Sequence, residues 1–197
     1  LKWLDGDIVC LQEVDPPYFA GILSEDMSLL GYEGLFVKKS QHTGRQEGVA
    51  LFYKQDKFDL EESKTLVIDE IATDILAEAE SNKFGEVLLL AALRHKNSGT
   101  MVLTATTHIL WKDLLEPVTQ VCEIAFVTQA VCDMLTSLRS RAKHVAYILC
   151  GDFNIDPHYP AYHLLKDGQL SEKQFSILQT VDYLRFPADI EKPPQVP

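Results

Sequence analysis

The amino-acid sequence predicts an α/β fold with mixed β-sheets, and three observations support that prediction. Short runs of β-branched and apolar residues alternate with stretches in which apolar residues recur at helical spacing. Two strand-like runs flank the polar segment KNSG at 96–99, which is typical of an antiparallel hairpin, whereas strict alternation of strands and helices would favour a parallel sheet. With 197 residues, of which 46% are hydrophobic, the chain can bury one sizeable core.

The first part of the chain is predicted to contain strands and one helical stretch. Residues 7–14 (DIVCLQEV) form an apolar run that becomes polar at its end, as a buried strand does. Apolar residues then recur near helical spacing until Gly31, a typical helix stop. The apolar run LFVKK at 35–39, a polar loop at 40–48 and the strand VALFY at 49–53 follow.

An acidic stretch, DEIATDILAEAES at 69–81, is predicted to be a helix with a solvated charged face. From about 116 to 142 the spacing of apolar residues is again helical, and basic residues gather at its end, where the helix macrodipole favours them. The other predicted elements are the hairpin strands 86–95 and 100–109, the strand HVAYILC at 144–150, and a short pair of helices around Gly168.

Net charge and cysteine spacing limit the kinds of protein that this chain can be. The net charge of −11 and the pI near 4.9 argue against non-specific attraction to nucleic acid, although a bound divalent cation could supply positive charge for a phosphate substrate. The four cysteines show no C-x-x-C spacing, and Cys10 and Cys150 lie in apolar runs, as buried thiols in a reducing compartment do. We therefore expect a cytoplasmic protein with no membrane-crossing segment.

Neither end of the chain resembles a natural domain boundary. Leu1 begins in the middle of an apolar pattern, and the other end runs into the proline-rich segment ADIEKPPQVP. We expect residues 1–186 to be part of one domain that lacks both of its ends, and residues 187–197 to be a tail.

The segment GDFNIDP places two polar residues directly after the last strand. Asp152 and Asn154 are two residues apart, so on an extended segment both side chains would point to the same side. There they could offer a carboxylate base and an amide donor to one substrate atom. The alternative is an ordinary turn, in which Asp152 accepts backbone N–H groups.

Two other strand-like runs end in the same way. Glu13 follows VCLQ, and a carboxylate at a strand end suits a hard cation such as Mg²⁺. His108 ends the run that contains Thr106 and Thr107. An isolated Glu or His in such a place is more often structural, but three distant strands that each end in a residue used by phosphoryl chemistry predict a shared site.

The motifs LQEVD, EGVALFY, TTHILW and GDFNIDP, in this order and approximate spacing, resemble the endonuclease/exonuclease/phosphatase superfamily. Within it, the chain is most similar to the branch of deadenylases, nocturnin, angel proteins and 2',5'-phosphodiesterases. The resemblance covers residues 5 to about 170. It implies a two-sheet mixed β-sandwich flanked by helices in four layers, and a Mg²⁺-dependent phosphoesterase, with Mn²⁺ as an alternative cofactor.

The resemblance also implies roles for individual residues. Glu13 matches the metal-binding glutamate of the superfamily, and Asp152 matches the aspartate that orients or deprotonates the attacking water. Asn154 matches the asparagine that holds the phosphate, and His108 the histidine that stabilises the developing charge. In the loop before VALFY, His42 and Arg45 could contact phosphate. QEGVALFY resembles the superfamily's segment beside the substrate groove, which would give Gln46 and Glu47 a binding role, but we favour a loop that leads into a core strand.

The chain departs from the superfamily pattern in three places. The strand with a metal-site asparagine would lie upstream of Leu1, and no Ser-Asp-His motif follows GDFN. The stretch 111–127 is apolar and acidic where relatives have a short loop and a helix with a basic residue. We expect either a variant helix that packs on the sheet or an irregular segment that exposes apolar surface.

These observations predict a phosphodiesterase that acts on the 3' ends of RNA, such as poly(A), or on 2',5'-linked oligoadenylate. The first alternative is a phosphatase of a small nucleotide or inositol phosphate, which the acidic composition mildly favours. The second is a degenerate, non-catalytic scaffold module. Metal-induced thermal stabilisation would separate an enzyme from a scaffold, since a formed metal site stabilises the folded state.

Overall fold

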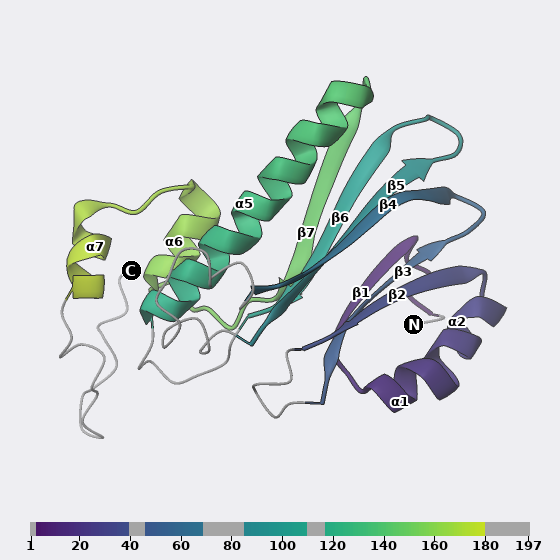
Figure 1. The fold of residues 1–197 in the computed structure, drawn as a ribbon, viewed down its shortest axis with the longest axis horizontal. Helices are drawn as coiled ribbons and strands as arrows, with labels where there is room; N and C mark the ends of the chain where they lie inside the picture. Colours follow the sequence, from purple (N-terminus) through teal and green to yellow (C-terminus); the bar gives the residue numbers. More distant parts are fainter. Residues whose placement is uncertain (1–2, 40–45, 69–84, 110–116, 180–197) are drawn as a thin grey trace.

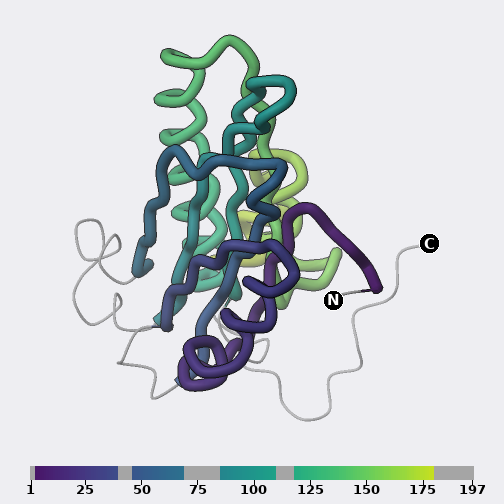
Figure 2. The backbone as a smooth tube through the Cα atoms, turned by 90° about the vertical axis from the view of Figure 1, so that its right-hand side faces the viewer, coloured from purple at the N-terminus to yellow at the C-terminus, as the bar shows by residue number. Residues whose placement is uncertain are grey.

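Two β-sheets lie face to face, and helices cover the outer face of each sheet (Figure 1). The computed structural model describes residues 3–39, 46–68, 85–109 and 117–179. The predicted four-layer α/β sandwich is confirmed, and in Figure 2 the N-terminal helices lie in front of the sheets and α5 lies behind them.

The smaller sheet contains three antiparallel strands in the order β1 (Ile8–Val14), β3 (Gly48–Lys54) and β2 (Tyr32–Lys38). Side chains on β3 alternate between its two faces. Val49, Leu51 and Tyr53 point into the core between the sheets, while Ala50 and Phe52 face the N-terminal helices. This strand is buried on both faces, which explains its continuous apolar sequence.

The N-terminal helices form one continuous helical segment, as predicted. It consists of α1 (Pro16–Tyr18), the π-helical turn η1 (Phe19–Leu23) and α2 (Ser24–Leu29). Asp15 caps its start by accepting the Tyr18 backbone N–H at 3.2 Å. Gly31, with a φ of 85°, follows its end.

The larger sheet has the order β4 (Phe58–Val67), β5 (Val87–His95), β6 (Met101–His108) and β7 (Val145–Asp152). β6 and β7 are parallel and the other pairs are antiparallel, so the sheet is mixed, as expected. The pattern of the sequence did not predict β4. Its sequence FDLEESKTLV is largely polar because the strand lies at the edge of the sheet with many exposed side chains.

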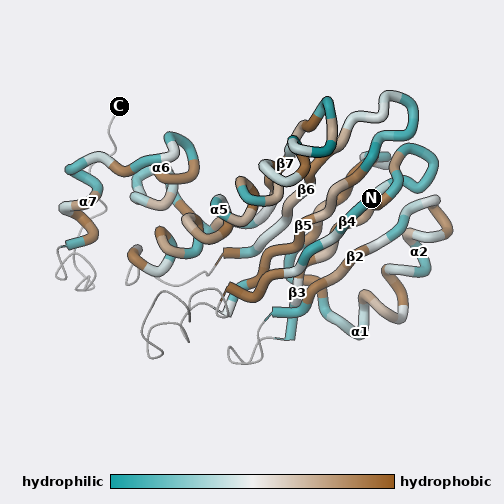
Figure 3. Tube along the Cα trace, turned by 45° about the horizontal axis from the view of Figure 1, so that its top comes forward, coloured by the Kyte–Doolittle hydropathy of each residue, from teal (hydrophilic) through white to brown (hydrophobic). Residues whose placement is uncertain are grey.

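The long helix α5 (Pro117–Arg141) covers the outer face of this sheet, with Ile124, Val127 and Leu138 fully buried. The variant-helix expectation for 111–127 is therefore correct for the described residues from 117 onward. The expectation of no membrane-crossing segment was too strong, since Val118–Arg141 is long and apolar enough by length and composition. A core helix meets the same criteria, and here the apolar side of α5 packs on the sheet (Figure 3).

Two short helices, α6 (Pro160–Asp167) and α7 (Glu172–Gln179), follow β7 and flank Gly168, whose φ of 71° ends α6. Several predicted features lie outside the described residues. They are the acidic helix 69–81, most of the loop 40–48, the first part of the segment 111–127, and the tail 187–197.

Candidate active site

The C-terminal ends of β1, β6 and β7 meet at one edge of the sandwich. Register pairs His108, the last residue of β6, with Asp152, the last residue of β7. On the facing sheet, Gln12 donates from Nε2 to Oγ1 of Thr106 at 3.1 Å, which ties β1 to β6. The strand ends that the sequence predicted to share a site are therefore neighbours.

A β-bulge gives Glu13 its direction. Leu11 pairs with Ala50 and Val14 with Gly48, so that Gln12 and Glu13 together oppose a single residue of β3. Glu13 has a φ of 56°. Such a conformation costs about 1–3 kcal/mol in a residue other than glycine, and it is found mostly where the surrounding structure enforces it, often at functional sites.

Asn154 lies beyond the end of β7 and is held by four contacts. With a φ of 47°, it leaves the extended conformation, so the expectation that it continues the strand beside Asp152 was wrong. Its backbone N–H donates to Oδ1 of Asp152 at 3.0 Å, and its carbonyl accepts from Nε2 of Gln120 on α5 at 3.0 Å. Its side-chain Nδ2 lies 2.9 Å from the carbonyl oxygen of Ile109 and 3.1 Å from Nε2 of His108.

These contacts assign the tautomer of His108. The carbonyl of Ile109 can only accept, so it orients the Asn154 amide with Nδ2 toward it, and the second N–H of Nδ2 then donates to Nε2 of His108. Burial lowers the pKa of His108, and Lys39 lowers it further, against the opposing effect of nearby carboxylates. The lowered pKa favours the neutral ring, and the hydrogen bond from Asn154 to Nε2 places the ring proton on Nδ1.

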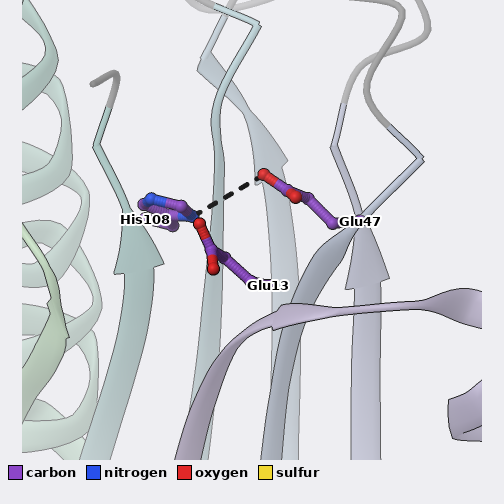
Figure 4. Close-up of side chains that lie close together, drawn as sticks. All are labelled: Glu13, Glu47 and His108. Carbon is purple, nitrogen blue, oxygen red and sulfur yellow. Dashed lines mark ion pairs between the residues drawn. The ribbon is translucent and has the colours of Figure 1, made fainter. Parts of the chain in front are cut away.

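Glu13, Glu47 and His108 form a cluster that could hold a metal ion, with one ligand atom from each residue and all three within 4.8 Å of one another (Figure 4). Mg²⁺ at about 2.1 Å from its ligands places them about 3 to 4.2 Å apart, so a small rotation of one carboxylate would suffice. In the hydrogen-bond arrangement that places a proton on Nδ1 of His108, the two glutamates would supply the oxygen ligands and His108 would lie beside the ion without binding it. The side chains present thus fit a hard divalent cation.

A buried ion pair lies beneath this cluster. Nζ of Lys39 is 2.9 Å from Oε2 of Glu86 and 3.2 Å from Oε1 of Glu47, and the side chains of Lys39 and Glu86 are fully buried. Oε1 of Glu47 also lies 4.0 Å from Nδ1 of His108. This Nδ1 atom has no hydrogen-bond partner within the described part of the chain. Glu47 therefore connects the interior of the sandwich to the candidate site.

The structure thus brings Glu13, His108, Asp152 and Asn154 together, and their catalytic roles stay predictions. Glu47, for which the sequence favoured a place in a loop over a role in binding, belongs to the same site. The neighbouring Gln46 instead accepts from Nζ of Lys38 at 2.7 Å in an exposed position. The predicted phosphate contacts His42 and Arg45 lie outside the described residues.

Three residues of the site were not singled out from the sequence. Lys39 and Glu86 each lie next to a strand end, a position in the sequence that is more typical of charged residues on the surface. They are 47 positions apart, and no local sequence pattern predicts that they form an ion pair. Gln120 lies in the helix that the sequence predicted correctly. Only the packing of α5 on β6 and β7 shows that its side chain reaches the loop after β7.

Comparison with known proteins relates the whole chain to one family. A family model described as "Endonuclease/Exonuclease/phosphatase family" matches residues 1–192. The 2',5'-phosphodiesterase 12 of Homo sapiens is 27% identical over 190 residues, which are 87% of this chain and 29% of that protein. Nocturnin of Mus musculus is 30% identical over 174 residues, which are 84% of this chain and 36% of that protein. The chain thus spans about a third of the length of the curated relatives it matches.

Solved structures show the same fold. ANGEL2, described as a 2',3'-cyclic phosphatase in complex with adenosine-2',3'-vanadate, superposes with a TM-score of 0.70 at 22% identity, over 86% of this chain and 46% of that chain. The human nocturnin catalytic domain with bound sulfate superposes with a TM-score of 0.63 at 24% identity, over 94% of this chain and 65% of that chain.

Proposed function

Because the chain belongs to the endonuclease/exonuclease/phosphatase family, we propose that it is a Mg²⁺-dependent phosphodiesterase acting on the 3' ends of RNA or on 2',5'-linked oligoadenylate. The observation that carries the proposal is the convergence of Glu13, His108, Asp152 and Asn154 at one edge of the sandwich. The names of the relatives add to it, since they include a 2',5'-phosphodiesterase and the 3'-5'-exoribonuclease subunit Ccr4 of Aspergillus oryzae.

Each side chain has a task in this reaction. Asp152 is an exposed carboxylate that would orient the attacking water and accept its proton. His108 would contact a phosphate oxygen through the N–H that the tautomer places on Nδ1. Both N–H groups of the Asn154 amide are engaged by Ile109 and His108, so Asn154 would exchange one of these hydrogen bonds to contact the phosphate.

The metal would be held by Glu13, with Glu47 beside it. A divalent cation supplies electrostatic stabilisation of the charge that develops on phosphate oxygens, and it offsets the acidic character of the chain. The net charge of −11 otherwise opposes the approach of a polyanion.

The acidic composition also supports a second candidate, a phosphatase of a small nucleotide or inositol phosphate. Such a substrate needs fewer phosphate contacts from Lys and Arg than a long RNA does. A non-catalytic scaffold module is the third candidate.

One assay separates these alternatives. The intact gene product is incubated with Mg²⁺ and with 3',5'-oligo(A), 2',5'-oligo(A), nucleotide phosphates and inositol phosphates, beside the Glu13→Gln variant. We expect shortening of at least one oligonucleotide, and loss of that activity in the variant. Phosphate release from the small molecules alone would overturn the RNA proposal, and a folded protein inactive on every substrate would support the scaffold.

A further inference from the structure

An open cavity of about 590 Å³ adjoins the loop after β7, and Asp152 and Asn154 form one of its walls. Aromatic and aliphatic side chains from the loop and from α6 form the rest, among them Phe153, Tyr159, Tyr162 and Leu165. A volume of this size is in the range of small-molecule sites in proteins. The cavity is therefore an extension of the candidate active site toward α6.

The aromatic wall is held in place by backbone hydrogen bonds. The N–H of Tyr159 donates to the carbonyl of Asp156 at 2.9 Å, and the N–H of Tyr162 donates to the carbonyl of Tyr159 at 3.0 Å. Pro160 begins α6, where its restricted φ favours the helix start. Both tyrosines are half-buried and line the cavity, so part of each side chain packs against the protein while part remains accessible to a ligand.

Charge determines what kind of group this cavity can accept. Among the described residues that line it, the charged ones are Asp152 and Asp156, both carboxylates. These carboxylates disfavour a second phosphate, since the described lining residues include no cation; Lys166 lies outside the lining, with Nζ 6.0 Å from the centre of the Tyr162 ring. An uncharged, planar and partly apolar group would instead gain contact with the rings.

We propose that this cavity is a nucleobase subsite, in which the base next to the scissile phosphate lies against Tyr159 and Tyr162 while its phosphate meets Asp152 and Asn154. The inference rests on the proposed function and makes it more specific. Aromatic side chains stack on bases in most recognition of single-stranded nucleic acid, and every base has a face to offer. A sugar or inositol phosphate would leave the aromatic wall without a partner.

The test compares two substrates that differ only in one base. The first is oligo(A), and the second is the same oligonucleotide with an abasic residue at the cleaved end. In the full chain with Mg²⁺, Tyr162→Ala and Tyr159→Ala should each raise KM for oligo(A), with a loss in kcat/KM of about tenfold to a hundredfold. Neither variant should change kcat/KM for the abasic substrate by more than about twofold, because that substrate places no base in the cavity.

Matched variants control for indirect effects. Tyr162→Phe keeps the ring and should retain the wild-type kcat/KM for oligo(A). Tyr147→Ala removes a tyrosine that is 58% exposed on β7 and should leave both substrates unaffected. Thermal melting of each variant shows whether the fold is intact.

Equal losses on both substrates, or wild-type kcat/KM for oligo(A) in the double variant Tyr159→Ala/Tyr162→Ala, would overturn the subsite while leaving the phosphodiesterase proposal intact. Absence of cleavage of any oligonucleotide by the folded wild-type protein would overturn both proposals. Cleavage of the intact and abasic substrates at equal rates by the wild-type protein would overturn the subsite alone.

Discussion

Two walls of the candidate site are built in opposite ways. The buried wall consists of Lys39, Glu47, Glu86 and His108, and three of these four side chains are almost entirely excluded from solvent. The loop wall consists of residues 152–162, in which Asp152 is exposed and the tyrosines are half-buried. Both walls face the same small region, since Nε2 of His108 lies 3.1 Å from Nδ2 of Asn154.

The difference shows how the fold can separate stability from chemistry. In the buried wall Lys39 pairs with both Glu86 and Glu47, and removal of either member of the buried Lys39–Glu86 pair leaves an uncompensated charge in a medium of low polarity. The loop wall is positioned by hydrogen bonds of backbone and amide groups, so the exposed carboxylate of Asp152 can be altered with little effect on folding. Substitutions in the two walls should therefore give different phenotypes.

The largest expected effect is on catalysis in the loop wall. Asp152→Asn removes the proposed base but keeps an oxygen that can accept the Asn154 N–H. We expect turnover of the preferred oligonucleotide to fall by about 10²- to 10⁴-fold, with an unchanged melting temperature. Steady-state kinetics and thermal melting test this, with Asp133→Asn on the exposed side of α5 as the control. Retained turnover would remove Asp152 from its assigned role.

The next effect is on stability in the buried wall. Lys39→Met leaves Glu86 buried without its ion-pair partner, and we expect the free energy of unfolding to fall by about 3–5 kcal/mol. The double variant Lys39→Met/Glu86→Gln removes both charges and should recover much of that loss. Urea denaturation measures both, and Lys57→Met, which breaks an exposed ion pair with Asp7, is the control. Equal losses in the single and double variants would show that the pair's charge is not the cause.

A smaller effect is expected where the loop wall joins the sheet. A Cβ at Gly151 would collide with the carbonyl oxygen of Thr107 on β6, so Gly151→Ala should displace β7 and cost about 1–3 kcal/mol. Because Asp152 follows directly, turnover should fall as well. Gly21→Ala, at a helical position with no heavy atom within 4 Å of the new Cβ, is the control and should be neutral or slightly stabilising. Wild-type stability of Gly151→Ala would show that β7 has room to shift.

The smallest effect is a pH dependence that belongs to the buried wall. Burial lowers the pKa of His108 in the folded protein below its ordinary value of 6.5. Between these two pKa values the unfolded chain binds more protons, so the free energy of unfolding falls as the pH drops below about 6.5 and levels off below the folded pKa.

Each unit of difference between the two pKa values contributes about 1.4 kcal/mol. Urea denaturation of the metal-free protein across this pH range, beside His108→Gln, measures the contribution as the difference between the two curves. Parallel curves would show that His108 does not titrate differently in the folded state.

The sequence predicted the strands and helices in which apolar residues recur at regular spacing, and it did not predict β4, which lacks such spacing. The strands containing Glu13, His108 and Asp152 were predicted because they are apolar, short and end in polar residues. β4 was missed because an edge strand with an exposed face needs no apolar alternation. Asn154 was identified by its motif, but its conformation was not, since a left-handed residue after a strand is not predicted by strand periodicity.

By itself, the sequence determined the layered α/β architecture and the family, because the spacing of hydrophobic residues and the order of the motifs are properties of the sequence alone. Only the tertiary structure decided that Lys39 and Glu86 form a buried pair behind Glu47, and that Tyr159 and Tyr162 share a cavity with Asp152. These contacts join residues from different elements, and they depend on how the sheets and helices pack, which no local spacing of residues specifies.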